Sequence, residues 1–285
     1  MYLDFFHLRK RPFTAAPDPA FFYPSEKHKE ALACVLYTVE QRKGFALITG
    51  EVGTGKTIMC RAALARLEGQ VESAVITNTA LTAKQLIEAV CEEFELDTRR
   101  ASKYRLIQRL NEFLIQRYRQ NVHVVLVIDE AQNLDKRTLE EVRLLGNLES
   151  DEDKLLQIIL VGQPELRRKI GSPELRQLHQ RIAVKFHLYP LTAAEVSDYI
   201  DHRLRVAGAD GADLFAPKAK HEAYAYSGGI PRLINLVCDH ALLEAYVSDQ
   251  HQVTAEVIRK VVRDMEGYYM DPQREAQQPL LDPIR

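Results

Sequence analysis

The chain has 285 residues, of which 46% are apolar and 27% charged, with 38 basic and 40 acidic side chains and a net charge of −2. This length suits one large domain, or a standard domain with a smaller one, and the apolar fraction is sufficient for a core that needs no disulfides. The balanced charge argues against a general nucleic-acid binder, which usually has a basic excess, although a local basic face remains open.

The N-terminal 23 residues are rich in aromatic residues and prolines. They predict an irregular strap lying against a domain. Charged residues interrupt their apolar ones, so we expect no signal peptide. No segment of the chain approaches the roughly 18 uncharged apolar residues of a membrane span. Ser25 then caps a helical pattern that stops at Gly44.

From Gly44 onward, strand-like runs alternate with helical patterns. The run VVLVI is apolar at consecutive positions, which is typical of a parallel strand buried on both faces. Thr82 with Gln85 forms a capping box, and Ser102 precedes a helical pattern over 103–120. This alternation predicts a doubly wound α/β fold over about 1–188. The expected strands are 45–49, 73–77, 122–128, 155–161 and 183–188.

After Pro190 the pattern becomes helical, beginning with the capping box of Thr192 and Glu195. The C-terminal stretch DPQREAQQPLLDPIR is polar and indicates a disordered tail or linker. Tyr268 and Tyr269 before it either dock a partner or pack on the helical domain. The helices expected are 193–206, 218–227, 231–248 and 255–266. The expected divisions are therefore a strap over 1–24, an α/β core over 25–189, a helical domain over 190–266 and a tail over 267–285.

The cysteines and histidines offer no metal or disulfide framework. Four scattered cysteines lie within helical apolar patterns, which favours free buried thiols in a reducing cytosol. The nine histidines form neither H-x-x-x-H nor H-E-x-x-H, so we expect no zinc site. His123 falls in a buried strand and is more typical of a core or edge histidine than of a ligand. The cysteines are Cys34, Cys60, Cys91 and Cys238.

Residues 50–57, GEVGTGKT, match the phosphate-binding pattern G-x-x-x-x-G-K-[ST]. They follow the strand FALIT and open the helix TIMCRAALARL, so backbone amides and the helix dipole would face the phosphates. Lys56 would reach the β- and γ-phosphates of ATP, and the Thr57 hydroxyl would bind Mg²⁺. The expected nucleotide contacts are Gly50, Val52, Gly53, Thr54, Gly55, Lys56, Thr57 and Ile58.

Asp129 and Glu130 follow the apolar run VHVVLVI, at the carboxyl end of a buried strand where open α/β sheets bind ligands. Asp129 would hold Mg²⁺ through its water shell, and Glu130 would polarise the attacking water. Such a pair often only caps a helix, but the phosphate loop favours the catalytic interpretation. Gln163 ends the next strand and would orient the water; its alternative is a hydrogen bond to its own loop.

Two arginine positions complete the predicted site. Arg181 ends a short helix before the fifth strand and would reach the ATP of a neighbouring subunit as an arginine finger; Arg176 on the same helix is the other candidate. Helices also end in arginine because of their dipole, which is the alternative explanation. Arg232 lies at a helix N-terminus, where the dipole does not favour a cation, so we expect it to meet the γ-phosphate.

The segments GEVGTGKT, VLVIDEAQNL, ILVGQPEL, LHQRI and SGGIPRLINLVCDHAL together resemble the AAA+ ATPases of the general secretion pathway protein A family. The opening MYLDFFHLRKRPFTAAPDPAFFYPSEKHKEAL resembles that family's N-terminal signature, and the resemblance covers roughly residues 1–266. It implies an AAA+ P-loop core of five parallel strands with a helical lid. It also implies sensor roles for Gln163 and Arg232, a finger at Arg181, and a strap near the adenine around Phe21 to His28.

Members of that family serve type II secretion, pilus biogenesis and exopolysaccharide or exosortase systems. Those that act in secretin assembly carry a transmembrane helix and a periplasmic peptidoglycan-binding domain after the ATPase, and neither is expected in this sequence. The chain is therefore a shorter member or a portion of a longer protein, and the peptidoglycan role does not transfer. We expect a cytoplasmic chain, or one held at the inner membrane by a partner.

Three functions are weighed. The first is an ATP-driven oligomeric switch or assembly factor for a cell-envelope system. The second is a DNA-dependent AAA+ regulator of the transposition type, which the basic residues of 99–119 favour. A solvated surface helix explains the same basic residues without DNA. A metabolic kinase fits poorly, because no acceptor site is apparent. The basic residues in question are Arg99, Arg100, Lys103, Arg105, Arg109, Arg117 and Arg119.

Overall fold

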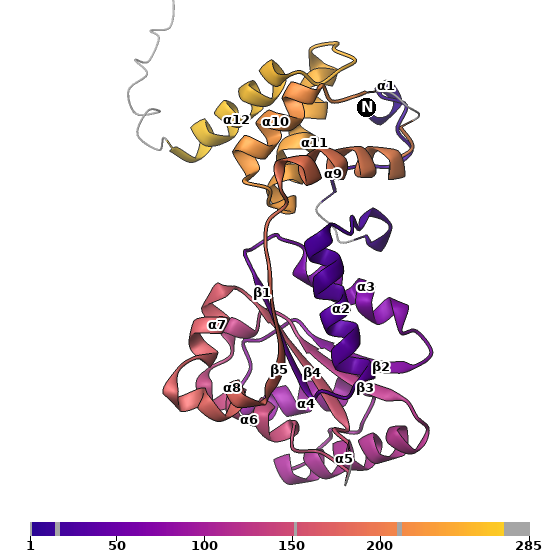
Figure 1. Cartoon of the computed structure of the whole chain (residues 1–285), viewed down its shortest axis with the longest axis vertical. Coiled ribbons are helices and arrows are strands. Elements are labelled where there is room, and N and C mark those ends of the chain that lie inside the picture. Colours follow the sequence, from indigo (N-terminus) through magenta and orange to yellow (C-terminus); the bar gives the residue numbers. More distant parts are fainter. Residues whose placement is uncertain (1, 15–17, 151–152, 210–212, 271–285) are drawn as a thin grey trace, which may run out of the picture. The chain divides into compact units, whose positions relative to one another are not determined.

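The computed structural model describes residues 2–14, 18–150, 153–209 and 213–270, with side chains as far as Gly267. The chain divides into two compact units. The described residues of 18–190 form an α/β unit, which holds the sheet, and the described residues of 1–17 and 191–285 form a helical unit (Figure 1).

A five-stranded parallel sheet forms the centre of the α/β unit, with strand order β2-β3-β4-β1-β5. Thr49 pairs with Gly162, and Ile128 with Leu160, so β1, β3 and β4 end at one edge of the sheet. The predicted five-stranded parallel sheet is confirmed. The strands are β1 Phe45–Gly50, β2 Val71–Ile76, β3 His123–Ile128, β4 Leu156–Gly162 and β5 Ile182–Leu188.

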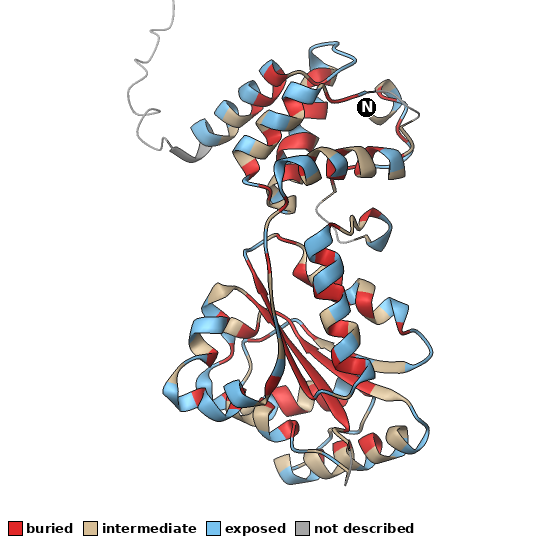
Figure 2. Cartoon of the chain, viewed as in Figure 1, coloured by how far each residue is buried: buried red, intermediate tan, exposed pale blue. Residues whose placement is uncertain are grey.

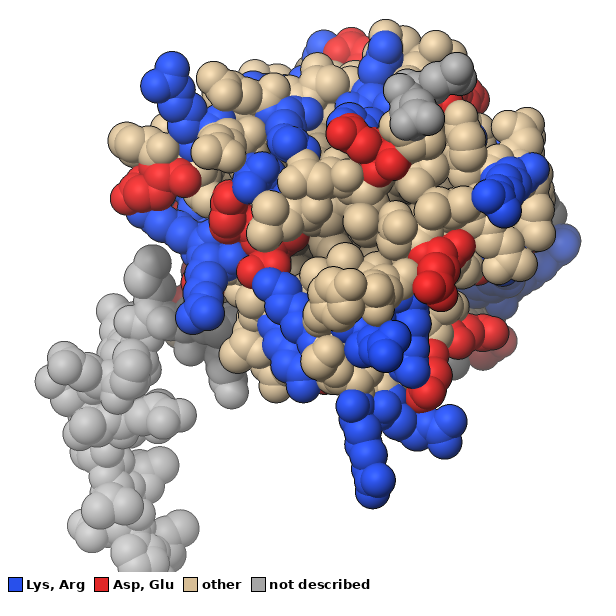
Figure 3. Space-filling model, turned by 90° about the horizontal axis from the view of Figure 1, so that it is seen from below, with Lys and Arg blue, Asp and Glu red and all other residues tan. Residues whose placement is uncertain are grey.

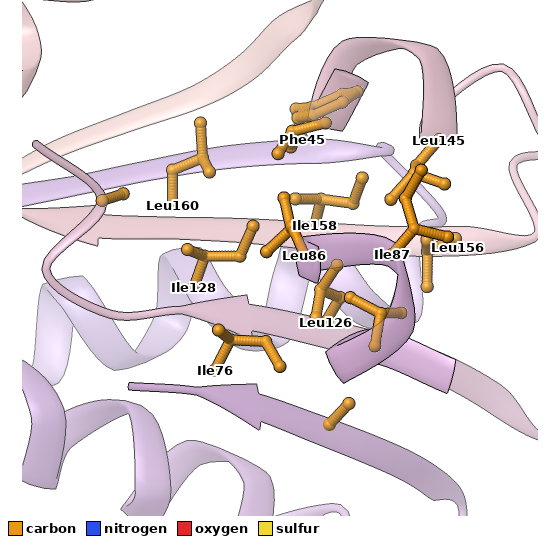
Figure 4. Packing of buried hydrophobic residues seen from close by; sticks show 14 of the residues in the cluster. Phe45, Ile76, Leu86, Ile87, Leu126, Ile128, Leu145, Leu156, Ile158 and Leu160 are labelled. Carbon is orange, nitrogen blue, oxygen red and sulfur yellow. The ribbon is translucent and has the colours of Figure 1, made fainter. Parts of the chain in front are cut away.

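Helices cover both faces of this sheet. One apolar cluster packs β1, β3 and β4 against α2 (Glu26–Glu40) and α3 (Lys56–Arg66). A larger cluster joins the other face to the remaining helices (Figure 4). These are α4 Ala83–Glu93, α5 Lys103–Arg119, α6 Lys136–Leu145, α7 Pro164–Ile170 and α8 Arg176–Arg181, with short 3₁₀ turns η2 Ala131–Asn133 and η3 Pro173–Leu175.

Successive residues of the central strands enter opposite clusters, because side chains alternate across a strand. Phe45 and Leu47 pack with the larger cluster, whereas Ala46 and Ile48 pack under α2 and α3. Every residue of β1 and β4 is buried (Figure 2). This two-sided burial is what the consecutive apolar runs predict.

The helical unit contains α9–α12 and the N-terminal segment of the chain. The Nε of Arg203 donates to the Pro12 carbonyl at 2.5 Å, and the Phe13 ring lies 5.7 Å from that of Phe215. The expected strap over 1–24 is therefore shared between the two units. It is also less irregular than expected, since it includes α1 Tyr2–Phe5 and the 3₁₀ turn η1 Pro19–Phe21. The other helices are α9 Ala193–Val206, α10 Pro217–Ser227, α11 Pro231–Val247 and α12 Ala255–Met270.

Local capping signals position these helices as the sequence predicts. The two capping boxes, which begin at Thr82 and Thr192, both form, and Ser25 and Ser102 cap α2 and α5. α12 continues to Met270, past the helix end expected at residue 266, and the rest of the expected tail, residues 271–285, lies outside the described part of the chain. Within the described ranges, no helix has the length and apolar character needed to cross a membrane.

Candidate nucleotide-binding site

The loop Gly50–Thr57 connects the end of β1 to the start of α3. Gly53 and Gly55 have φ angles of +81° and +94°, which favour glycine. Gly50 passes close to β5, where an added Cβ would lie 2.5 Å from the Leu188 carbonyl oxygen. Because α3 begins at Lys56, its first backbone amides lack helical acceptors and, with the helix dipole, suit a bound anion.

The Lys56 side chain is buried at the mouth of this loop. Its Nζ donates to the carbonyl oxygens of Gly50 and Glu51, both at 2.9 Å. Burial lowers the pKa of Lys56, and the nearby carboxylates of Glu130 and Asp129 oppose that shift. The ammonium group therefore sits beside the two acidic residues that the sequence assigns to catalysis.

Asp129 and Thr57 meet where a magnesium ion is expected. The Thr57 hydroxyl donates to Oδ2 of Asp129 at 2.5 Å, and Oδ1 of Asp129 accepts the Glu130 amide at 2.9 Å. A hydroxyl and a carboxylate are the hard oxygen ligands that Mg²⁺ prefers. Within the described ranges, no group of three or more His, Cys, Asp or Glu side chains is arranged for a metal. This pair thus fits an ion that takes its other ligands from phosphates and water.

A network of side-chain amides holds the Glu130 carboxylate. Oε2 of Glu130 accepts from Nε2 of Gln163 at 3.1 Å and from Nε2 of Gln132 at 2.5 Å. The backbone N–H of Gln163 in turn donates to Oε1 of Gln132 at 3.1 Å. Gln163 therefore lies next to the predicted base. Gln132 was missed, although its position in IDEAQ, just after the acidic pair, was the available signal.

The turn that carries Glu130 is held from both sides. Glu130 itself has a φ of +50°, which is uncommon for a residue other than glycine. The Thr79 hydroxyl donates to the Glu130 carbonyl at 3.1 Å, while Nζ of Lys169 donates to the carbonyls of Gln132 and Leu134 at 2.5 and 2.8 Å. No sequence pattern indicated Thr79 or Lys169, because both are distant from Glu130 along the chain.

We expect Gln163→Ala to lower the kcat for ATP about tenfold while the Kd for ATP stays within about twofold. The alanine removes the amide that positions Glu130 but leaves the phosphate loop intact. Steady-state ATPase assays and nucleotide titrations measure the two effects. Gln116→Ala, which removes an exposed amide from α5, serves as the control. A matching loss of ATP affinity would assign Gln163 to binding instead.

The two predicted arginine fingers lie away from this loop. Arg181 immediately precedes Ile182, which pairs with Phe45 at the start of β1. The phosphate loop begins at the opposite end of β1, five residues along, or about 16 Å away. Arg176 lies at the first turn of the same short helix. Arg232 is exposed near the start of α11 in the helical unit, so its contact with ATP stays a prediction.

Four of the seven basic residues of 99–119 pair with acidic ones. Arg99 and Arg109 pair with Asp97 at 2.9 and 3.6 Å. Lys103 pairs with Glu141 at 2.6 Å, and Arg117 pairs with Glu72. The face viewed in Figure 3 shows basic and acidic side chains interspersed rather than a continuous basic surface. This mixture is typical of a solvated surface.

The four cysteines all lie in helices and are free. Cys60 packs directly behind the loop, and burial raises the pKa of its thiol to about 12, with Asp129 adding to the shift. Burial likewise raises the pKa of Cys91 to about 11. Both thiols are therefore neutral core groups.

The parallel sheet, the phosphate loop after β1 and the acidic pair after β3 together define a nucleotide-binding P-loop protein of the AAA type. Residues 39–170 match the family model described as AAA domain. Over nearly all of its length the chain is similar to general secretion pathway protein A of Aeromonas hydrophila, with 42% identity over 268 residues. The match covers 94% of this chain and 49% of that protein, so the chain spans about half of the relative's length. The resemblance seen in the sequence is confirmed.

Solved structures with low sequence identity have the same fold. Aeropyrum pernix ORC1 in complex with DNA aligns with a TM-score of 0.69 and 19% identity, over 91% of this chain and 70% of that one. Drosophila ORC bound to DNA aligns with a TM-score of 0.69 and 15% identity, over 96% of this chain and 70% of that one. The Thermotoga maritima RuvB Holliday junction branch migration motor aligns with a TM-score of 0.57 and 19% identity, over 87% of this chain and 70% of that one. At these identities the likeness concerns the fold alone.

Proposed function

We propose that the chain binds Mg·ATP at Gly50–Thr57 and hydrolyses it to drive an oligomeric switch or assembly factor of a bacterial cell-envelope system. The observation that supports this most directly is the Glu130 carboxylate, held by Gln163 beside the Thr57–Asp129 pair and the phosphate loop. In this proposal Glu130 is the base, Thr57 and Asp129 bind the metal, and the loop holds the phosphates, which are the parts that phosphoryl transfer to water uses.

Each residue of the site has a part in that reaction. Bound Mg²⁺ would neutralise charge on the phosphates. Lys56 would turn its ammonium to the β- and γ-phosphate oxygens, and the loop amides would hold those phosphates in place. Glu130 would accept a hydrogen bond from the attacking water and draw its proton away, while Gln163 keeps the carboxylate in position.

Hydrolysis would be completed between copies of the chain. Arg181 lies at the end of the sheet opposite its own phosphate loop, farther than an arginine side chain extends. A neighbouring copy that offered Arg181 to this loop would supply the cation that stabilises transition-state charge. Arg232 would act as the second sensor of the γ-phosphate.

We expect the specific ATPase rate to rise with protein concentration, in parallel with self-association measured by light scattering. Arg181→Ala should lower the assembled rate by at least about 10³-fold. When Arg181→Ala subunits are mixed into unchanged protein, the ATPase rate should fall by a larger fraction than the fraction of variant subunits in the mixture. Arg176→Ala is the matched variant, and a loss confined to it would move the finger to Arg176. A specific rate independent of concentration would contradict catalysis between copies.

The cell-envelope assignment rests on the similarity to general secretion pathway protein A along 94% of this chain. Because the match covers 49% of that relative, we do not extend it to the relative's remaining half. We propose a site of action on the cytoplasmic side, where an envelope protein would hold the chain at the inner membrane. Ion pairs to four of the seven basic residues of 99–119 weaken the case for the DNA-dependent alternative. ATPase activity that required duplex DNA and fell steeply with salt would favour it.

A further inference from the structure

The His28 side chain links α2 to the phosphate loop. It is 4% exposed, and its Nε2 lies 3.0 Å from the carbonyl oxygen of Thr54. Its Nδ1 lies 2.7 Å from the Ser25 hydroxyl. The ring of Phe22 meets it edge to face at 5.8 Å. The imidazole is thus held from several directions against the backbone of the loop. His28 belongs neither to the phosphate-binding motif nor to the proposed catalytic residues, so their roles do not explain this contact.

The hydrogen-bond partners define where the ring protons lie. A carbonyl oxygen only accepts, so Nε2 of His28 donates to Thr54. In the neutral ring, Nδ1 then accepts from the Ser25 hydroxyl. The same Ser25 oxygen accepts the His28 amide at 3.4 Å as the N-cap of α2. Ser25 therefore fixes both the start of the helix and the orientation of the ring.

This contact determines how one peptide group of the loop is turned. The Thr54–Gly55 peptide is planar and trans, so its N–H points opposite to its carbonyl. With the carbonyl directed at His28, the Gly55 N–H is directed away from His28. The approach is close, since a Cβ on Gly55 would lie 3.1 Å from Nε2 of His28.

We infer that His28 is a positioning residue for phosphate binding, which holds the Gly55 N–H in advance toward the terminal phosphates of a nucleoside di- or triphosphate. The inference rests on the proposed function. A donor oriented before binding avoids the entropy cost of ordering it at the moment of binding. Because the phosphate contact exists in the substrate complex and in the transition state alike, losing it should raise KM and leave kcat nearly unchanged.

The test compares two substitutions of the same residue. His28→Phe keeps an aromatic ring but removes the donor, and should raise the Kd for Mg·ADP about tenfold, the loss expected of one hydrogen bond to a charged group. His28→Gln places an amide nitrogen where Nε2 lies and should recover most of the affinity. Isothermal titration with Mg·ADP gives the Kd, and steady-state ATPase assays give kcat and KM.

A control separates positioning from simple loss of stability. Val35 is fully buried on the same helix, in the apolar cluster under α3. Val35→Ala should lower the Tm at least as much as His28→Phe while keeping the Kd for Mg·ADP within about twofold of the unchanged protein.

The outcomes separate a failure of this inference from a failure of the proposed function on which it rests. If the unchanged protein binds Mg·ADP and His28→Phe binds it equally well, the inference is wrong and the proposed function stands. Equal weakening by the Phe and Gln variants, or by Val35→Ala, would also overturn it. Failure of the unchanged protein to bind Mg·ADP would overturn the proposed function and this inference together.

Discussion

A Lys56→Ala variant is expected to lose ATP hydrolysis by about 10²- to 10³-fold or more, the loss typical of removing one donor that stabilises developing charge. Lys56 is the buried cation of the loop, and its ammonium group already lies beside the carbonyls of Gly50 and Glu51. An alanine there removes the cation that the loop itself offers to the phosphates, so ATP affinity should fall as well.

The fold should tolerate this change. Burial lowers the pKa of Lys56, which means that the folded protein bears a cost for keeping the amine charged. The Glu51 carbonyl also keeps its bonds from the Thr54 amide and hydroxyl. We therefore expect a Tm close to that of the unchanged protein, measured beside ATPase assays and ATP titrations. Lys84→Ala, in an exposed pair with Glu88, is the control. Near-normal hydrolysis by Lys56→Ala would contradict the assignment of the loop.

Glu130→Gln is expected to bind ATP normally and hydrolyse it at least about 10²-fold more slowly. The substitution preserves the size of the side chain and an oxygen that accepts from Gln132 and Gln163. It removes the negative charge that draws a proton from water. Binding and chemistry should therefore separate, with a Kd for ATP within about twofold of the unchanged protein.

A single-turnover experiment measures this effect most directly, because it removes any contribution from product release. Glu112→Gln, an exposed position on α5, removes a charge of the same kind away from the site. Rapid hydrolysis by Glu130→Gln would transfer the role of the base to another group. Loss of ATP binding would mean that the carboxylate supports the shape of the site rather than the chemistry.

Local sequence signals were sufficient for most of the secondary structure, although α1 and η1 of the N-terminal segment were not expected. Ser25 and the capping box of Thr192 with Glu195 act within one helical turn, so the sequence around them contains the whole signal. The phosphate loop is equally local, since its glycines, lysine and threonine are contiguous between β1 and α3. Strand patterns succeeded because β1, β3 and β4 are buried on both faces, which requires apolar residues at consecutive positions.

Contacts between residues that are distant along the chain could not be predicted from such local sequence signals. His28 meets Thr54 across 26 residues, and Lys169 meets Gln132 across 37. These bonds exist because the sheet brings α2, α7 and the strand ends together. The N-terminal segment presents the same difficulty: its aromatic residues predicted a strap, but only tertiary packing decided that Phe13 joins the helical unit beside Phe215.

The sequence by itself thus determined the class of protein, because the phosphate loop and the acidic pair depend on adjacent residues in fixed order. It also determined the five strands and most of the helices, whose periodicity and caps are local. Only the tertiary structure decided that Gln132 and Gln163 both donate to Glu130 and that His28 contacts the phosphate loop. It also decided that Arg181 lies at the end of β1 opposite the phosphate loop. The reason is physical: hydrogen bonds of about 3 Å depend on how whole elements pack, and that packing is a property of the entire sheet.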